Sequence, residues 1–236
     1  MATCWAARLG GCSTKMSGEH IVSSAVFTGR TVRVKGLPWC RLDYKEIGRA
    51  ALTSNILCTA HNRLLSPTDR EAGRLFDSMR ERASISHRRV SEGKPPWPLA
   101  KYRVDGKLIE RWLVKTTINI YHQAPEGWTW HESEDFGRSP PDKFVGVAFG
   151  QGQLDKPYGL YVWAKIGDTI RGVAGLSFSS LHDEQNGLVG AYFETIGIRL
   201  LIWLSSLTPP NDAMRRAKRI EFNDLSQPSQ RLTLDW

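Results

Sequence analysis

Cysteine is missing from most of this chain: none occurs in the last 178 of its 236 residues. The sequence also lacks a long apolar run near its start, because Arg8 and the pair Gly10 and Gly11 interrupt the first dozen residues. A secretory signal peptide needs such a run, and we therefore expect a cytoplasmic protein.

Several familiar enzyme signatures are absent as well. The chain has no P-loop, no G-x-S-x-G elbow, no dinucleotide-binding fingerprint and no internal repeat, which excludes the common kinases, hydrolases and dehydrogenases. The longest apolar stretch, residues 187–207, carries Glu194 and Arg199 near its middle. Charges at that depth are costly in a bilayer, so we expect a hairpin of a sheet there and no membrane partner.

The composition is that of a folded protein with a basic surface. Hydrophobic residues make up 41% and charged residues 24% of the chain, which is typical of globular proteins. The formal net charge is +8, which favours an anionic partner such as nucleic acid. A chain of this length can form one large domain or two smaller modules, and we expect two.

The four cysteines, Cys4, Cys12, Cys40 and Cys58, all lie in the first quarter of the sequence. Cys58 and His61 form a C-x2-H pair, a spacing at which a thiolate and an imidazole can bind one tetrahedral metal ion. In a reducing compartment such a cluster favours a metal site over disulfides. We expect Cys4 and Cys12, rather than Cys40, to complete a zinc site; the alternative is that these are small buried thiols of a core.

Two short strands and a helix are predicted around the cysteines. Thr31–Lys35 alternates apolar and polar residues, as a strand does, and a strand-like segment precedes it at Glu19 and His20. Ser66 and Pro67 are typical of a helix start. The helix that follows has apolar residues at helical spacing, which are Ala72, Leu75, Phe76 and Met79.

With Glu19 and His20 on a strand, and His61 and Asn62 at a helix start, the chain over residues 1–82 resembles the HNH, or ββα-metal, endonuclease superfamily. The resemblance implies that His20 is the general base that activates water. It implies that Glu19 and Asn62 hold a catalytic Mg²⁺ or Mn²⁺ ion. Phosphodiester hydrolysis needs both parts, because the water must lose a proton and charge builds on the phosphate.

The same resemblance implies a structural zinc knuckle, with Cys58 and His61 as its second half and Cys4 and Cys12 as its first half. The sequence departs from the family pattern at several points. Glu19 replaces the usual Asp, Thr53 lies nearer than Asn55 to the place of the family's middle Asn, and His61 replaces a knuckle cysteine. Adjacent residues of an extended strand also point to opposite faces, so Glu19 and His20 need a bulge to address one site.

Beyond the first module we predict a linker over residues 84–100, which ends in a proline-rich run, and a second module over residues 101–236. A helix is predicted to start near Asp105 and to end near His122. Five short apolar runs then predict strands of an antiparallel sheet, at residues 144–150, 158–166, 172–180, 188–194 and 198–206. The polar run His182–Glu184 is a candidate metal cluster on composition, although a solvated turn is the better interpretation. The predicted fold class is α+β, with residues 1–83 as a zinc-bearing ββα-metal module and a helix plus antiparallel sheet after the linker.

A basic run near the C-terminus, Arg215, Arg216, Lys218 and Arg219, is the predicted phosphate-binding segment, although such a run can also be plain surface. The resemblance implies a metal-dependent endonuclease that acts on DNA, in defence against foreign genomes, with the second module selecting the substrate or a protein partner. The alternative is a zinc-containing module that binds nucleic acid or protein without catalysis. Net charge and zinc are common to both hypotheses.

Overall fold

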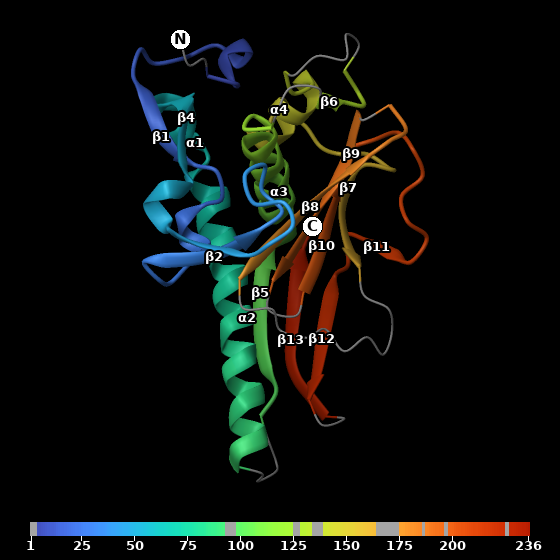
Figure 1. Cartoon of the computed structure of the whole chain (residues 1–236). Helices are drawn as coiled ribbons and strands as arrows, with labels where there is room; N and C mark the ends of the chain where they lie inside the picture. Colours follow the sequence, from blue (N-terminus) through green and yellow to red (C-terminus); the bar gives the residue numbers. More distant parts are fainter. Residues whose placement is uncertain are drawn as a thin grey trace.

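The structure is a computed structural model that describes residues 4–92, 98–124, 128–133, 139–163, 175–185, 187–195, 198–224 and 227–236. Its helices are α1 (Thr59–Leu64), α2 (Ser66–Glu92), α3 (Gly106–Tyr121) and α4 (Asp142–Ala148), with 3₁₀ turns η1 (Ala7–Leu9), η2 (Ser24–Val26) and η3 (Arg49–Leu52). Figure 1 shows α2, the longest helix, running beside the strand β5 (Ala100–Asp105). The predicted α+β class is confirmed.

The strands of the described residues form three sheets. Strands β1 (Met16–His20) and β4 (Thr53–Cys58) form an antiparallel ribbon. The large sheet has the order β11-β7-β10-β9-β8-β2-β3, with β6 beside β9, and the third sheet has the order β12-β13-β5. The remaining bounds are β2 (Thr31–Lys35), β3 (Lys45–Gly48), β6 (Thr129–Trp130), β7 (Gly159–Trp163), β8 (Leu176–His182), β9 (Gly187–Thr195), β10 (Ile198–Trp203), β11 (Ala213–Arg215), β12 (Arg219–Asp224) and β13 (Gln227–Asp235).

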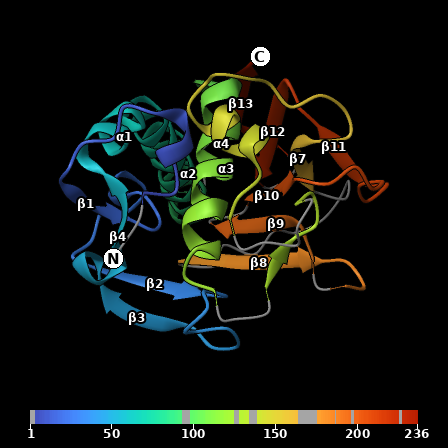
Figure 2. The ribbon, with the colours of Figure 1, turned by 90° about the horizontal axis from the view of Figure 1, so that it is seen from above.

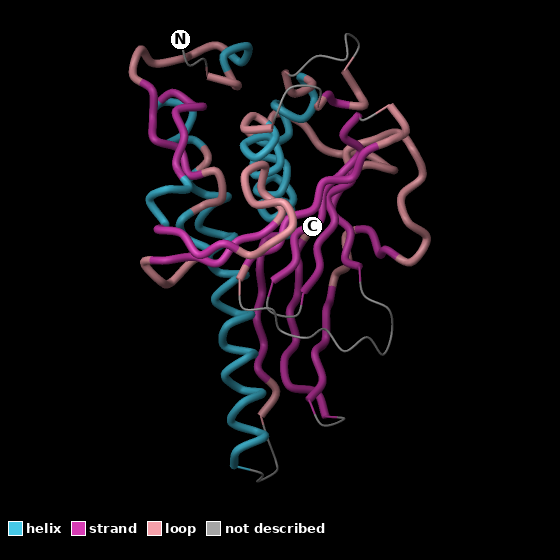
Figure 3. Tube along the Cα trace, in the orientation of Figure 1, coloured by secondary structure: helices cyan, strands magenta, loops and turns pink. Residues whose placement is uncertain are grey.

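Helix α3 lies at the centre of the molecule. Seen from above, it stands between α1, β1 and β4 on one side and the large sheet on the other (Figure 2). Figure 3 shows the same division, with the small β1–β4 ribbon apart from the other strands. Almost the whole of α3 is buried, including polar residues such as Lys115 and Asn119. Because α3 lies there, the segments near the N-terminus pack against it.

The two predicted modules share a sheet and a core. Strand β2, from the first module, pairs in parallel with β8 from the second, with Val34 opposite Leu176. Gly36, just after β2, has a positive φ of 83°, and a Cβ there would lie 1.5 Å from the Phe178 carbonyl oxygen. Only glycine allows this close approach. The main apolar core runs from Cys4 to Leu234; that residues 1–83 fold as a separate unit stays a prediction.

The structure confirms several local predictions. The buried stripe of α2 is the predicted one, and Asp105 caps α3 by accepting a hydrogen bond from the Leu108 backbone N–H. Residues 187–207 contain the expected hairpin, as β9 and β10 pair antiparallel. Asp183 accepts hydrogen bonds from the Gln185 and Gly187 N–H groups, which is the turn expected there. Every helix in the described ranges is too short or too polar to cross a membrane.

Two predictions of secondary structure are wrong. The linker expected over residues 84–100 is helical through Glu92, as part of α2, and residues 93–97 lie outside the described residues. The strand expected over residues 144–150 is instead α4, whose buried residues Phe144, Val145 and Val147 follow a helical spacing. Of the other predicted strands, residues 164–166 and 172–174 also lie outside the described residues, as do residues 196–197 between β9 and β10.

Candidate metal centre and the Glu19–Lys115 site

Four side chains from separate segments meet at the start of α1. The ligand atoms of Cys4, Cys12, Cys58 and His61 all lie within 4.8 Å of one another. The His61 Nδ1 atom is 3.3 Å from Cys4 Sγ, 3.5 Å from Cys12 Sγ and 3.2 Å from Cys58 Sγ. Zinc bond lengths of about 2.0 Å to nitrogen and 2.3 Å to sulfur place tetrahedral ligands about 3.5 Å apart. The four atoms therefore have the spacing of a metal centre.

Local structure sets this spacing. Cys58 ends β4 and is the N-cap of α1, where its thiol accepts a hydrogen bond from the His61 backbone N–H. The Thr59 N–H bonds to the Lys15 carbonyl and the Thr59 hydroxyl bonds to Ser13, which brings the Cys12 loop to the helix. Cys40, the alternative ligand, lies elsewhere, with its thiol 3.8 Å from the Val34 carbonyl oxygen.

Within the cluster, the pKa values of Cys58 and Cys12 are shifted in opposite directions. Burial raises the pKa of Cys58, but hydrogen bonds from His61 and Ser13 outweigh it and bring the value to about 6. Burial, together with the hydrogen bond and charge of Cys4, raises the pKa of Cys12 to about 11. Cys58 is thus a thiolate at neutral pH before any metal binds, whereas Cys12 must release a proton on binding.

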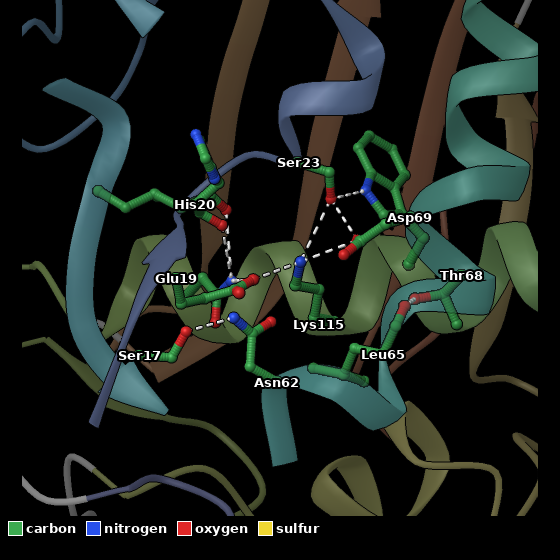
Figure 4. A network of polar contacts seen from close by, with 12 residues as sticks. Ser17, Glu19, His20, Ser23, Asn62, Leu65, Thr68, Asp69 and Lys115 are labelled. Carbon is green, nitrogen blue, oxygen red and sulfur yellow. Dashed lines mark hydrogen bonds and ion pairs between the residues drawn. The ribbon is translucent and has the colours of Figure 1, made fainter. Parts of the chain in front are cut away.

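Glu19, the predicted metal ligand of the catalytic site, lies in a buried network formed by residues of β1, α2 and α3. Its side chain is 3% exposed and pairs with the Lys115 ammonium, whose side chain is fully buried. The Lys115 Nζ atom is also 2.9 Å from Asp69 Oδ1 and 3.2 Å from Ser23 Oγ. Asn119 donates to Glu19 Oε1 at 3.3 Å. Figure 4 shows these oxygens gathered around one ammonium group.

The electrostatics of Glu19 follow from this packing. Burial raises the pKa of its carboxyl group, while the charge and hydrogen bond of Lys115 act in the opposite direction and limit the shift. A buried carboxylate is stable only when it is paired and hydrogen-bonded. Lys115 and Asn119 supply both kinds of contact, so the ionised form of Glu19 has partners within the protein.

His20 and Glu19 point to opposite faces of the β1–β4 ribbon. They pair with the consecutive residues Thr53 and Ser54 of β4, and the register shift in β1 comes earlier, between Ser17 and Glu19. Figure 4 shows the His20 ring directed away from the Glu19 carboxylate. Burial lowers the pKa of the half-buried His20, and the positive charges of Lys115 and Arg49 lower it further. No bulge lies between Glu19 and His20, and such a bulge would be needed to bring both side chains to one site.

Asn62 does face strand β1. Its Nδ2 atom donates to Ser17 Oγ at 2.6 Å, on the strand that also carries Glu19. The Thr53 hydroxyl, at the place of the family's middle Asn, donates to the Ala50 carbonyl at 2.8 Å. Glu19 and His20 therefore lie on β1 and Asn62 contacts the same strand from α1, but of these three side chains only that of Glu19 pairs with Lys115.

The C-terminal basic run does not form one patch. Arg215 donates to the carbonyls of Tyr158 and Leu154. Arg216 forms an ion pair of 2.8 Å with the buried Glu110. Lys218 and Arg219 are exposed. Arg215 and Arg216 thus have partners within the fold, and Arg219 lies 3.7 Å from Glu221 in an exposed ion pair.

The partners of Glu19 in this network were not predicted as site residues; they are Lys115, Asp69, Ser23 and Asn119. The sequence does carry a signal for Lys115, because Leu113, Val114 and Ile118 surround it on an apolar helix, and a charge that is buried there must have a partner. Its partners are distant in sequence, so pattern alone does not identify them. Comparison of the chain with protein-family models, with curated proteins and with solved structures gave no match.

Proposed function

We propose that Cys4, Cys12, Cys58 and His61 bind one structural zinc ion. Three thiolates and one imidazole form a donor set that zinc prefers, and all four positions are filled by protein, as in closed structural sites. The ion would join the N-terminal segment to the β4–α1 junction. Across the described ranges no other group of three or more metal-ligating side chains comes this close together.

Metal analysis of the purified protein tests this proposal. We expect about one zinc per chain, and loss of that zinc in Cys58→Ser. Cys40→Ser is the matched control, because Cys40 is a buried cysteine outside the cluster. A protein without zinc, or equal zinc in both variants, would contradict the proposal.

We further propose that the chain is an HNH-like scaffold that binds nucleic acid without cleaving it. The observation that carries this is the position of Lys115, whose ammonium lies against the Glu19 carboxylate, where the HNH resemblance would put a divalent cation. An ammonium and a divalent metal ion at one carboxylate repel each other. Glu19 is also too buried to bring a metal ion to a phosphate. The net charge of +8 supports the binding of nucleic acid.

A second candidate, the metal-dependent endonuclease, is favoured by His20 and Asn62. The lowered pKa of His20 keeps its imidazole neutral at pH 7, as a general base requires. Asn62 faces β1, as the nuclease hypothesis expects. In this case Lys115 must leave Glu19 before a Mg²⁺ or Mn²⁺ ion can bind.

Incubation of plasmid DNA with the full chain and Mg²⁺ or Mn²⁺ separates the two functions. We expect no cleavage by the wild type, while a labelled oligonucleotide is bound. Metal-dependent cleavage that disappears in His20→Ala, with the circular dichroism spectrum unchanged, would establish the endonuclease instead. Loss of a general base costs about a hundredfold or more in rate, so the difference is easily measured.

A further inference from the structure

The β2–β3 hairpin carries a large share of the positive charge. Together with the flanking Arg30 and Arg49 it contains six Lys or Arg residues and two acidic residues, a net charge of +4 over residues 30–49, which is half of the +8 of the whole chain. Strand β3 lies at the edge of the large sheet. The hairpin is therefore basic and lies at the edge of the large sheet.

Two of these cations lie on the outer face of β2. Val32 and Val34 are buried, and Arg33 and Lys35 alternate with them on the opposite face. Both cations lie close to the Tyr44 ring, with Arg33 Cζ 4.6 Å and Lys35 Nζ 5.7 Å from its centroid. Neither cation forms an ion pair within the described part of the chain. Both charges are available to an anion.

Apolar side chains are exposed beside these charges. Trp39 is 39% exposed and Leu42 is 81% exposed, and both lie in the loop that joins β2 to β3. The exposed Arg41 lies between them in sequence. The Lys45 ammonium donates to the Trp39 carbonyl at 3.1 Å, which ties the loop to β3. Aromatic rings next to cations are what stacked bases and a phosphate backbone require.

We propose that the hairpin surface, defined as Arg33, Lys35, Trp39, Arg41 and Tyr44, binds single-stranded nucleic acid. The inference rests on the proposed nucleic-acid-binding function and locates its contact surface. The cations contact phosphates, and the exposed face of Trp39 stacks on a base. This surface fits better than the C-terminal basic run, where Arg215 and Arg216 donate to groups of the fold.

Fluorescence anisotropy with a labelled oligothymidylate of about twenty nucleotides tests the proposal on the full chain. We expect Arg33→Ala/Lys35→Ala to weaken binding at least tenfold at low salt. Each phosphate contact on a single strand contributes about 0.7 to the slope of log K against log salt, so the slope should fall by about 1.4. Trp39→Ala should weaken binding by about fivefold or more and leave the slope unchanged.

Lys101→Ala/Lys107→Ala is the matched control, because it removes two exposed positive charges outside the hairpin surface. The dissociation constant of this control should stay within twofold of the wild-type value, which is a difference of about 0.4 kcal/mol or less in binding free energy. If the wild type binds and Arg33→Ala/Lys35→Ala binds as tightly as this control, the inference is overturned. The proposed function would still stand in that case. A wild type that binds no oligonucleotide would overturn both. Tighter binding of a matching duplex would overturn the choice of single strands.

Discussion

The Lys115 ammonium is ion-paired with the Glu19 carboxylate, and their side chains are 0% and 3% exposed. This pair connects α3 to β1, and under our proposal the Lys115 ammonium takes the place of a catalytic cation. The positive charge of Lys115 stabilises the ionised form of this buried acid. The first two predictions concern this pair.

We expect Lys115→Met to destabilise the fold strongly. Methionine keeps most of the volume but leaves Glu19 and Asp69 without their shared cation. Removing one partner of a buried pair costs about 3–5 kcal/mol of unfolding free energy. Urea unfolding measures this loss. The double variant Glu19→Gln/Lys115→Met should be less destabilised than the sum of its single variants, and additivity would contradict the coupling.

We expect Lys115→Ala to gain affinity for Mn²⁺. The truncation leaves oxygen atoms of Glu19, Asp69 and Ser23 around the vacated space, and oxygen ligands suit hard divalent ions. The Asp69 side chain is 24% exposed and provides access. Mn²⁺ at a hundredfold excess over its dissociation constant would stabilise the variant by about 2.7 kcal/mol, seen as a rise in melting temperature. The wild type serves as the control, and an equal rise in both proteins would show binding elsewhere.

The sequence predicted those parts of the site that depend on local spacing. Cys58 and His61 are three residues apart, and their meeting follows from the start of α1. The choice of Cys4 and Cys12 over Cys40 also agrees with the cluster. Lys115 could not be placed from the sequence, because its contacts with Glu19 and Asp69 arise only when α3 packs between β1 and α2.

The wrong secondary-structure predictions have a similar cause. A short apolar run such as residues 144–150 fits either a strand or a helix by periodicity alone. Residues 84–92 lack an apolar stripe, yet α2 continues through them because tertiary contacts support its length. One such contact is made by Arg89, whose guanidinium donates to the Pro228 carbonyl at 3.1 Å and to the Pro98 carbonyl at 3.5 Å.

His20 should make stability depend on pH in the neutral range. Its pKa in the folded protein is lowered by burial and by the charges of Lys115 and Arg49. In the window between that value and the unfolded pKa of about 6.5, the unfolded chain binds more protons, so stability falls as the pH falls. We would measure urea unfolding between about pH 7.5 and 5. As the pH falls, the free energy of unfolding should decrease less in His20→Asn than in the wild type. The same slope in both proteins would contradict the shift.

Metal removal should release the N-terminal segment. Cys4 and Cys12 bracket Arg8, and Lys15 follows them, so a bound ion would hold both trypsin sites against the fold. We expect a chelator to speed tryptic cleavage at these residues before the core is cut. Cys58→Ser should show the fast cleavage without chelator, and Cys40→Ser should behave as the wild type. Unchanged cleavage in the presence of chelator would contradict a tethering role.

Arg216 should be a structural residue rather than a phosphate contact. It forms an ion pair with Glu110, whose side chain is 6% exposed, and also donates to the Leu154 carbonyl at 2.8 Å. Arg216→Ala leaves the Glu110 carboxylate buried without its cation, which should cost about 3 kcal/mol of unfolding free energy. Arg219→Ala is the matched control, because Arg219 is 61% exposed and lies 3.7 Å from Glu221. An exposed pair of this kind contributes about 1 kcal/mol or less, so equal losses in the two variants would contradict the structural role of Arg216.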